Sequence, residues 1–365
     1  MTQTAHTAPR LIPTLRDDIA HGGVCDELRR DAREIEEFYL DQEERDRLRR
    51  KSAFGRALLL AWWVVKNSIL RLTSARRILL ILGIVMIFLD TSIREDESKV
   101  SFHFTGLGAS CLLLVIILEL KDKLLARDEL ESGRAVQLAM SPVPSPPVPG
   151  WDVWLYTRSA NEVGGDLVDF LRLDDRRSAA VVGDVAGKGL AAALFMVKIQ
   201  STLRALAPDY PSPAELVAKL NTILLRDGLP GKFASLFYVA IDSPSGDIRM
   251  VNAGHMPPVV VSGTGVTELP KGNPALGLSA SAQFEARDQH LSAGDALVVY
   301  SDGLTEAQNV AGEFFGAERF KTLCAGCRGL AAQPFGMRIV EAVAAFEGNA
   351  RRSDDLSLMI LRKAG

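Results

Sequence analysis

The sequence predicts an α+β protein, an antiparallel β-sandwich flanked by helices and preceded by a two-helix transmembrane hairpin. Two strongly apolar runs, Ile78–Ile93 and Phe104–Leu118, lie close together in the first third of the chain. A stiff proline-rich stretch, Pro142–Gly150, then separates them from the remainder. Beyond it, short β-rich runs mostly neighbour one another and a few longer helical stretches interrupt them. That order favours an α+β sandwich over a βαβ repeat.

Length and composition narrow the functional classes. The chain has 365 residues, of which 47% are hydrophobic, and a formal net charge of −3. This length is enough for one domain with a large hydrophobic core and for a second region of the chain outside that domain. A chain without a basic excess is not expected to bind nucleic acid. The first 20 residues lack the apolar stretch of a secretory signal.

Residues 1–75 are expected to form a cytoplasmic helical region. The charged run Cys25–Lys51 places Glu and Arg at spacings that allow i,i+4 pairs, which indicates a solvated helix. The following run, Ala57–Leu70, contains Trp62 and Trp63, residues typical of a membrane interface. It is interpreted as an amphipathic helix lying on the membrane, with a buried helix of a soluble protein as the alternative.

The transmembrane hairpin is placed at residues 76–120. Each apolar run is slightly shorter than the roughly 20 residues of an ideal span, but can extend into its flanks. Only the short polar segment Arg94–Lys99 separates the two runs, and the outer flanks are positive: Arg71, Arg76 and Arg77 before, Lys121 and Lys123 after. Positive outer flanks predict a multi-pass protein of the bacterial cytoplasmic membrane with both termini in the cytoplasm. A buried hairpin of a soluble protein is the alternative.

Residues 121–149 are expected to connect the membrane segment to the catalytic part. Residues 119–141 read as a helix, although Gly133 weakens it by about 1 kcal/mol relative to Ala. The apolar positions do not keep a strict heptad, so a homodimer formed through this connector is a hypothesis.

Residues 150–365 are expected to form one domain. The β-rich runs are WDVWLYT, AAVVGDV, ASLFYVAID, IRMVNAG, PVVVS, ALVVYSDG and LSLMILR. Ser243–Asp247 is a turn between two of them, as in an antiparallel hairpin. The helical stretches are Leu190–Ala207, Ser212–Asp227 and Ala317–Phe346.

Acidic residues of this domain repeatedly stand where a strand meets a glycine-rich turn. They are Asp166 in EVGGDLVDF, Asp184 in VGDVAGKG, Asp302 in VYSDGLTE, and Asp354 with Asp355 in RSDDLSL. Glycines beside them allow the backbone to approach a ligand closely. A set of carboxylates without His or Cys at ligand spacing suits Mg²⁺ or Mn²⁺ rather than zinc. Two such ions can activate water and neutralise phosphate charge, as phosphomonoester hydrolysis requires.

Two other motifs carry residues of chemical interest. The segment Val182–Gly189 follows a strand and opens a helix, but it departs from a Walker phosphate loop at Val182 and at Gly189. The pair Cys324 and Cys327 has no second pair or histidines to complete a zinc site. It reads as two thiols in a helical stretch, with a redox switch as the alternative.

The motifs, in their order along the chain, resemble the catalytic domain of PPM-type serine/threonine phosphatases, the protein phosphatase type 2C superfamily. The SpoIIE/RsbU branch is the most similar, and the resemblance covers about Trp151 to Arg362. It includes GDVAGKGLAAALFM, VNAGHMPPVVV, LSAGDALVVYSDGLTEAQN and DDLSLMILR. The preceding ELESGRAVQLAMSP resembles the helix that leads into such domains. The resemblance implies a β-sandwich with a binuclear Mn²⁺ or Mg²⁺ site at one end.

The resemblance also implies residue roles. Asp184 would bridge the two ions and the Val185 carbonyl would face one of them. Asp302 and Asp354 would complete one ion, and Asp166 would act at or just behind the other. Supporting candidates around the site are Glu162, Asp169, Asp355, Lys188 and His255.

The chain departs from the family at the general acid. Eukaryotic members have a histidine just after the bridging aspartate, where this chain has Val185–Gly187. His255 is a candidate substitute, although its motif also reads as a turn packing beside the site. Lys188 could contact phosphate or simply be solvated at a helix start.

The implied activity is a metal-dependent phosphoserine/phosphothreonine protein phosphatase. The resemblance further implies a phosphorylated anti-anti-sigma protein of the STAS type as the substrate. The alternative is a membrane-tethered interaction module with a weak or inactive phosphatase domain.

Overall fold

The computed structural model describes residues 53–89, 91–95, 98–102, 104–227, 231–242, 245–350 and 352–365. The predicted helix at Cys25–Lys51 lies outside these ranges. The chain divides into two compact units, Met1–Leu124 and Leu125–Gly365, and each is described by itself.

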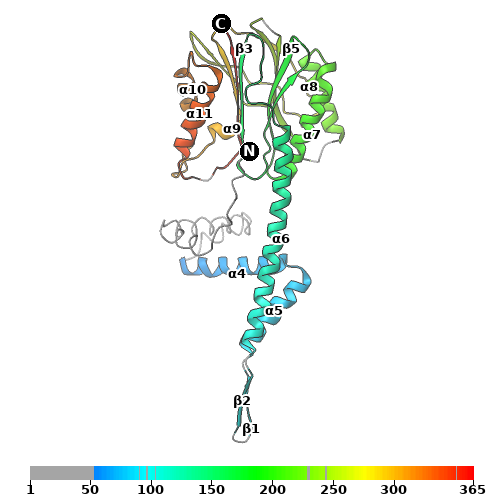
Figure 1. Ribbon diagram of the computed structural model, residues 1–365, viewed down its shortest axis with the longest axis vertical. Coiled ribbons are helices and arrows are strands. Elements are labelled where there is room, and N and C mark those ends of the chain that lie inside the picture. The colour runs from blue at the N-terminus through cyan, green and yellow to red at the C-terminus, as the bar shows by residue number, and fades with distance from the viewer. Residues whose placement is uncertain are drawn as a thin grey trace, which may run out of the picture. The chain divides into compact units, whose positions relative to one another are not determined.

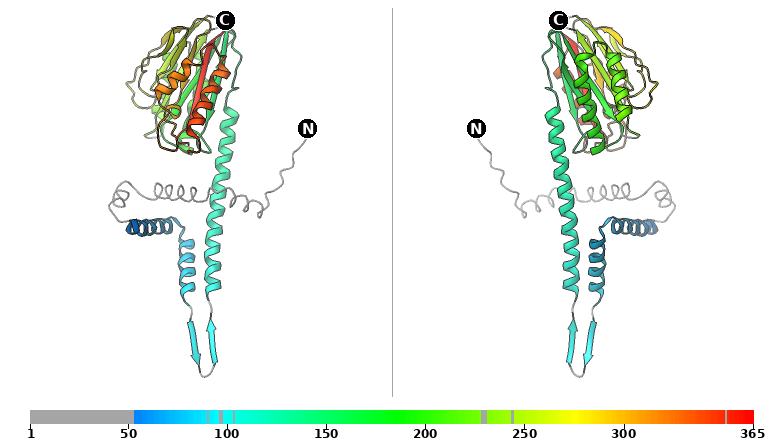
Figure 2. Two further views of the ribbon diagram at one scale, coloured as in Figure 1. Left: turned by 90° about the vertical axis from the view of Figure 1, so that its left-hand side faces the viewer. Right: turned by 90° about the vertical axis from the view of Figure 1, so that its right-hand side faces the viewer.

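The first unit is a helical hairpin with a short β-ribbon. Its elements are α4 (Ala53–Arg71), α5 (Ser74–Phe88), the antiparallel strands β1 (Thr91–Glu95) and β2 (Ser98–Phe102), and the first part of α6 (Thr105–Met140). Figure 2 shows α5 and α6 side by side. Gly83 and Gly108 allow this approach, because a Cβ on Gly108 would lie 2.6 Å from the Gly83 carbonyl oxygen. Arg76 ties the two helices through Glu119 and Asp122, each at 2.7 Å.

The predicted apolar run Ile78–Ile93 is not one helix. The helix ends at Phe88, and the threonine, serine and isoleucine that follow form part of strand β1, which their β-propensity favours. The 15 residues of α5 span only about 22 Å, against about 30 Å of bilayer hydrocarbon. By contrast, the predicted span Phe104–Leu118 and the connector 119–141 form one continuous helix, α6, which Gly133 does not interrupt.

Among the described helices, one stretch has the length and composition of a membrane span. This stretch, Leu190–Asp209, is 44% buried and belongs to the second unit. Helices α5 and α6 do not qualify: α5 is too short, and charged residues follow the apolar part of α6. The structure therefore does not support the transmembrane hairpin.

The second unit contains two antiparallel sheets packed face to face. In the described residues, one sheet has the order β10-β7-β6-β5-β4 and the other β3-β12-β11-β8-β9. The strands are β3 (Trp151–Arg158), β4 (Leu167–Arg172), β5 (Arg177–Val185), β6 (Ala234–Asp242), β7 (Asp247–Ala253), β8 (Val259–Ser262), β9 (Gly265–Glu268), β10 (Arg287–His290), β11 (Ala296–Tyr300) and β12 (Leu356–Lys363). The predicted α+β sandwich is confirmed.

Helices cover both outer faces of the sandwich (Figure 1). Helices α7 (Leu190–Leu206) and α8 (Pro213–Asp227), with the short η1 (Ala207–Asp209), lie against the first sheet; α10 (Ala317–Ala325) and α11 (Ala332–Glu347) lie against the second. A third buried cluster, with Phe237, Leu297 and Met359, fills the space between the sheets. Apolar side chains on both faces of the strands thus form three apolar layers, one between the sheets and one under the helices on each outer face. The strand ends are left for polar groups.

The structure also corrects predicted elements of the second unit. The predicted helix Ala317–Phe346 is two helices, because the chain turns at Gly326–Leu330 and Gly329 has a φ of +79°. Strands β4, β9 and β10 were not predicted. β9 and β10 are short and mostly polar, and the Asp166 motif obscured β4.

The two cysteines of the CxxC pair lie in the core between α10, α11 and the second sheet. Both are free, and both side chains are fully buried. Burial raises the pKa of the thiols of Cys324 and Cys327. Buried, protonated thiols are poor nucleophiles, so the structure favours the packing role over a redox switch.

Replacement by alanine is expected to have opposite effects on stability at two helical glycines, Gly336 and Gly133. A Cβ on Gly336 would stand 1.9 Å from the buried ring of Trp154, so we expect Gly336→Ala to lower the free energy of unfolding by about 1–3 kcal/mol. A Cβ on Gly133 meets nothing nearer than 3.8 Å, so Gly133→Ala is expected to raise it by up to about 1 kcal/mol. Urea denaturation of both variants measures the difference. Equal effects would contradict the packing at Trp154.

Candidate active site

The aspartates singled out from the sequence stand at the ends of neighbouring strands. In the first sheet, Asp166 directly precedes β4 and Asp184 is the last residue but one of β5, with Leu167 paired to Gly183. In the second sheet, Asp302 begins the short helix α9 (Asp302–Thr305) after β11, and Asp354 lies two residues before β12. The register pairs Tyr300 with Leu358, so these two also share one edge.

Asp355 joins the two edges. Its carboxylate accepts hydrogen bonds from the backbone N–H groups of Ala160 and Gly165, both at 2.7 Å, and from that of Asp166 at 3.4 Å. It is buried, as expected for a carboxylate that satisfies several backbone donors. A Cβ on Gly303 would lie only 2.0 Å from the Asp355 carbonyl oxygen, so only glycine fits beside it. Asp355 therefore holds the Asp166 loop against the strand ends of the other sheet.

The carboxylates raise one another's pKa values. Burial, followed by the charges of Asp302 and Asp354, raises the pKa of Asp184 to about 7. Burial and the charge of Asp184 raise the pKa of Asp166 well above its ordinary value. Burial and the charge of Asp354 also raise the pKa of Asp302. Negative charge is therefore concentrated at this edge, and Lys188, which pairs with Asp354, offsets only part of it.

The same residues fit a divalent cation. Asp166 Oδ2 is buried and has no hydrogen-bond partner of ordinary geometry among the described residues, although the hydroxyls of Ser301 and Ser357 lie near enough to lower the pKa of this carboxyl. All the donors are oxygens, the type that Mg²⁺ and Mn²⁺ prefer. As the side chains stand, no three His, Cys, Asp or Glu residues of the described ranges surround a common point. The fit therefore rests on the donor chemistry and the unbalanced charge.

Val185 and Lys188 lie close to this cluster. The Val185 carbonyl oxygen would be 3.3 Å from a Cβ on Gly165, so it faces the Asp166 loop. Lys188 Nζ lies 3.1 Å from Asp354 Oδ2, and its side chain is exposed. It is the kind of cation that can approach a phosphate from solvent.

Two of the supporting candidates are placed elsewhere. Asp169 is fully buried and forms a two-pronged ion pair with Arg204 of α7, at 2.8 and 2.7 Å. Arg204 also donates to the carbonyl oxygen of Met140, the last residue of α6. Asp169 thus anchors the end of α6 and is not brought to the aspartate cluster. Glu162 is exposed on the loop before Asp166.

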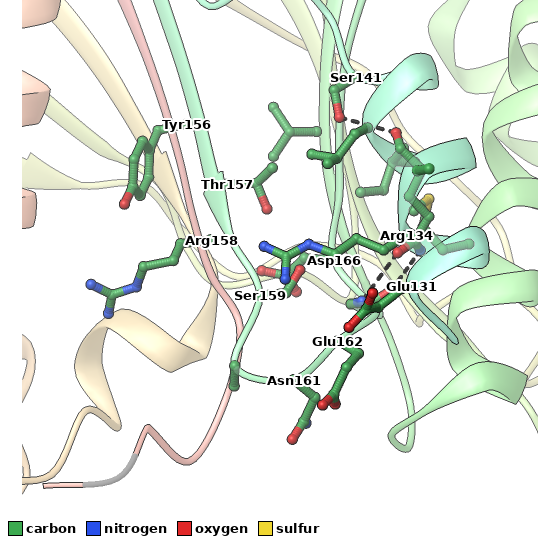
Figure 3. Close-up of a pocket in the computed structure, with 18 of the residues that line it drawn as sticks. Glu131, Arg134, Ser141, Tyr156, Thr157, Arg158, Ser159, Asn161, Glu162 and Asp166 are labelled. Atoms are coloured by element: carbon green, nitrogen blue, oxygen red, sulfur yellow. Dashed lines mark hydrogen bonds between the residues drawn. The ribbon is translucent and has the colours of Figure 1, made fainter. Parts of the chain in front are cut away.

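A cavity of about 840 Å³ adjoins the Asp166 loop on the side of α6. Figure 3 shows its lining, with Glu131 and Arg134 of α6, Arg158 of β3, and Glu162 and Asp166. Gln137 of α6 donates to the Gly164 carbonyl at 2.9 Å and accepts from the Gly164 N–H at 3.2 Å. The helix therefore contacts the loop that carries Asp166.

His255 lies in the turn between β7 and β8 and is buried. Its Nδ1 is 2.8 Å from Ser235 Oγ, and Ser235 Oγ also accepts the backbone N–H of Asp184 at 3.2 Å. Burial lowers the pKa of His255 to about 4. Sequence reasoning missed Ser235, Arg204 and Gln137, since each acts through a contact with a residue distant in sequence.

Comparison with known families supplies the classification. The sequence model of the family "Stage II sporulation protein E (SpoIIE)" matches residues 174–364, more than half of the chain. The chain belongs to the SpoIIE family.

Curated relatives are consistent with SpoIIE membership. Protein IcfG of Synechocystis is 29% identical over 71% of this chain and 46% of its own length. The Bacillus subtilis protein RsbU, named a phosphoserine phosphatase, is 26% identical over 65% of this chain and 70% of its own length. The chain thus spans less than half the length of IcfG.

Solved structures share the SpoIIE fold. The RsbU and RsbW domains of a Mycobacterium tuberculosis protein match with a TM-score of 0.53 and 27% identity, covering 62% of each chain. The SiaA-PP2C domain of Pseudomonas aeruginosa matches with a TM-score of 0.58 and 18% identity, covering 66% of this chain and 98% of that one. At this identity the second comparison speaks for the fold alone.

Proposed function

We propose that this chain is a metal-dependent protein phosphatase that hydrolyses phosphoserine or phosphothreonine. The observation that carries the proposal is the gathering of Asp166, Asp184, Asp302 and Asp354 at the strand ends of a SpoIIE-family domain, with a buried carboxylate oxygen that has no hydrogen-bond partner of ordinary geometry among the described residues. The relative named a phosphoserine phosphatase supports the reaction class.

The aspartates are the residues that would hold Mn²⁺ or Mg²⁺. Two ions, when bound, would activate water for attack and neutralise charge on the phosphoryl oxygens. Asp184 belongs to the first sheet, yet its pKa is raised by the charges of Asp302 and Asp354 at the edge of the second. It is therefore the proposed bridging residue. Lys188, whose exposed Nζ lies 3.1 Å from Asp354 Oδ2, is proposed to contact the phosphate beside the aspartates. No described residue is assigned as the general acid: His255 is buried and its pKa is lowered to about 4.

Hydrolysis of a generic aryl phosphate tests the reaction class. We expect the full chain to release phosphate with Mn²⁺ and to lose this activity in excess chelator. A folded chain that binds Mn²⁺ without hydrolysing the ester would instead favour the interaction module.

The substrate proposed is a phosphorylated anti-anti-sigma protein of the STAS type. Similarity to RsbU, and to a solved protein that carries RsbU and RsbW domains, supports this choice. Phosphate release from a phosphorylated STAS protein, compared with an unrelated phosphoprotein, tests it. Equal rates on both would contradict the assignment.

Membrane attachment and dimerisation are proposed for the first unit and α6. Exposed apolar side chains along α6, including Leu113, Ile117, Leu120 and Leu124, support a lipid or helix partner. The location proposed is the bacterial cytoplasmic membrane with the catalytic domain in the cytoplasm. Fractionation tests the membrane, and sedimentation of the detergent-solubilised chain tests a homodimer. Recovery as a soluble monomer would contradict both.

A further inference from the structure

A buried histidine links the backbone of Asp184 to the turn between β7 and β8. Ser235, near the start of β6, lies opposite Asp184 in the strand register. Its Oγ accepts the Asp184 backbone N–H at 3.2 Å and is 2.8 Å from His255 Nδ1. A Cβ on Gly183 would lie 2.7 Å from the Ser235 carbonyl oxygen, so the close approach of β5 and β6 at this point requires glycine.

The side chain of Asn252 holds the turn that carries His255 through two hydrogen bonds. Asn252 Oδ1 accepts the His255 backbone N–H at 2.8 Å, and Asn252 Nδ2 donates to the His255 carbonyl oxygen at 3.1 Å. Gly254 has a φ of +74°, a conformation that glycine adopts most readily. These contacts fix the backbone of the turn from which the imidazole extends to Ser235.

One arrangement of protons agrees with all the contacts of this histidine. In it, Ser235 Oγ accepts the Asp184 N–H on one lone pair and donates its hydroxyl proton to Nδ1. The ring is then neutral with its proton on Nε2, in agreement with burial, which lowers the pKa of His255 to about 4. Nε2 makes no hydrogen bond of ordinary geometry within the described ranges, although the Tyr300 backbone is close enough to favour a proton on the ring. Tyr300 lies two residues before Asp302.

We propose that His255 is a positioning residue for Asp184: through Ser235 it fixes the backbone of the bridging aspartate and so increases the affinity of the site for divalent cations. This inference rests on the proposed function. A carboxylate ligand binds a cation best when its backbone is already in place, and residues that support ligands in this way commonly contribute 10–100-fold to metal affinity. Because the ring is buried and its Nδ1 is occupied by Ser235, it acts on the site through Ser235 and not on substrate.

Mn²⁺ affinity of the full chain, measured by titration calorimetry, is the direct test. We expect His255→Leu, which removes both ring nitrogens, to raise the Mn²⁺ dissociation constant about 10-fold or more. His255→Asn keeps an acceptor near the Nδ1 position and is expected to stay within about threefold of wild type. Ser235→Ala should resemble His255→Leu, and the double variant should be no worse than either, since the two side chains act as one unit.

The matched control is His290→Leu, the same change at an exposed histidine of β10. It should leave the dissociation constant unchanged. Thermal unfolding in chelator separates positioning from stability, because a purely structural role would lower the midpoint and leave Mn²⁺ affinity intact. Ser235→Ala keeps the test available if His255→Leu does not fold.

Wild-type affinity in folded His255→Leu or Ser235→Ala would overturn the inference, as would fully additive effects in the double variant. These results would leave the proposed phosphatase standing. A wild-type chain that binds no Mn²⁺ would overturn the proposed function and this inference together.

Discussion

Replacing Asp184 by Asn is expected to lower the Mn²⁺-dependent rate of phosphate release at least about 100-fold. Residues that merely support a ligand already contribute 10–100-fold, and Asp184 is the carboxylate on which the charges of Asp302 and Asp354 converge. Asn keeps the shape of the side chain but removes the negative charge. The steady-state rate with an aryl phosphate, at saturating and limiting Mn²⁺, measures the loss and shows whether extra metal restores it.

The matched control is Asp288→Asn, the same change on the exposed strand β10. Asp288 forms a surface ion pair with Arg249, which contributes at most about 1 kcal/mol to stability. Asp288→Asn should therefore keep the wild-type rate of phosphate release. Activity of Asp184→Asn within tenfold of wild type would exclude Asp184 as a bridging ligand.

The metal-free protein is expected to lose stability as the pH rises from about 5 to 8. Burial and the neighbouring charges of Asp302 and Asp354 raise the pKa of Asp184 to about 7 in the folded chain, against an ordinary value of 3.8. Between these values the folded state keeps a proton that the unfolded chain releases. The stabilisation is complete below the lower value and is lost as the pH passes the upper one, with a size on the order of a few kcal/mol.

Mn²⁺ should reverse this loss, because a bound cation replaces the proton. At 100 times its dissociation constant a ligand stabilises the folded state by about 2.7 kcal/mol. Urea denaturation in chelator and in Mn²⁺, across this pH range, measures both effects.

Asp184→Asn is the informative comparison for this pH effect. In chelator at pH 8 it should be more stable than wild type, with a flatter dependence on pH. A wild-type chain that becomes more stable between pH 5 and 8 in chelator, relative to this variant, would contradict the charge repulsion.

The strand pattern was readable because it is local. Alternating and continuous apolar runs predicted seven of the strands, and α7 and α8 begin and end within one residue of their predicted bounds. The break between α10 and α11 was missed because glycine is tolerated inside helices, and only the packing around Cys324 and Cys327 decides where the chain turns. The apolar run Ile78–Ile93 predicts one helix where the structure has a helix and a strand, because hydropathy does not separate a helix from a strand.

The sequence by itself determined the α+β sandwich and placed Asp166, Asp184, Asp302 and Asp354 at strand ends, since both follow from local periodicity and glycine-rich turns. Only the tertiary structure decided which acidic residues meet. Asp169 is the third residue of β4 and stands three positions after Asp166, yet its carboxylate pairs with Arg204 near the end of α6. Asp355 instead binds the backbone of the Asp166 loop in the other sheet. Strand register and sheet packing set these partners, and they depend on contacts between residues up to 195 positions apart. No local pattern contains that information.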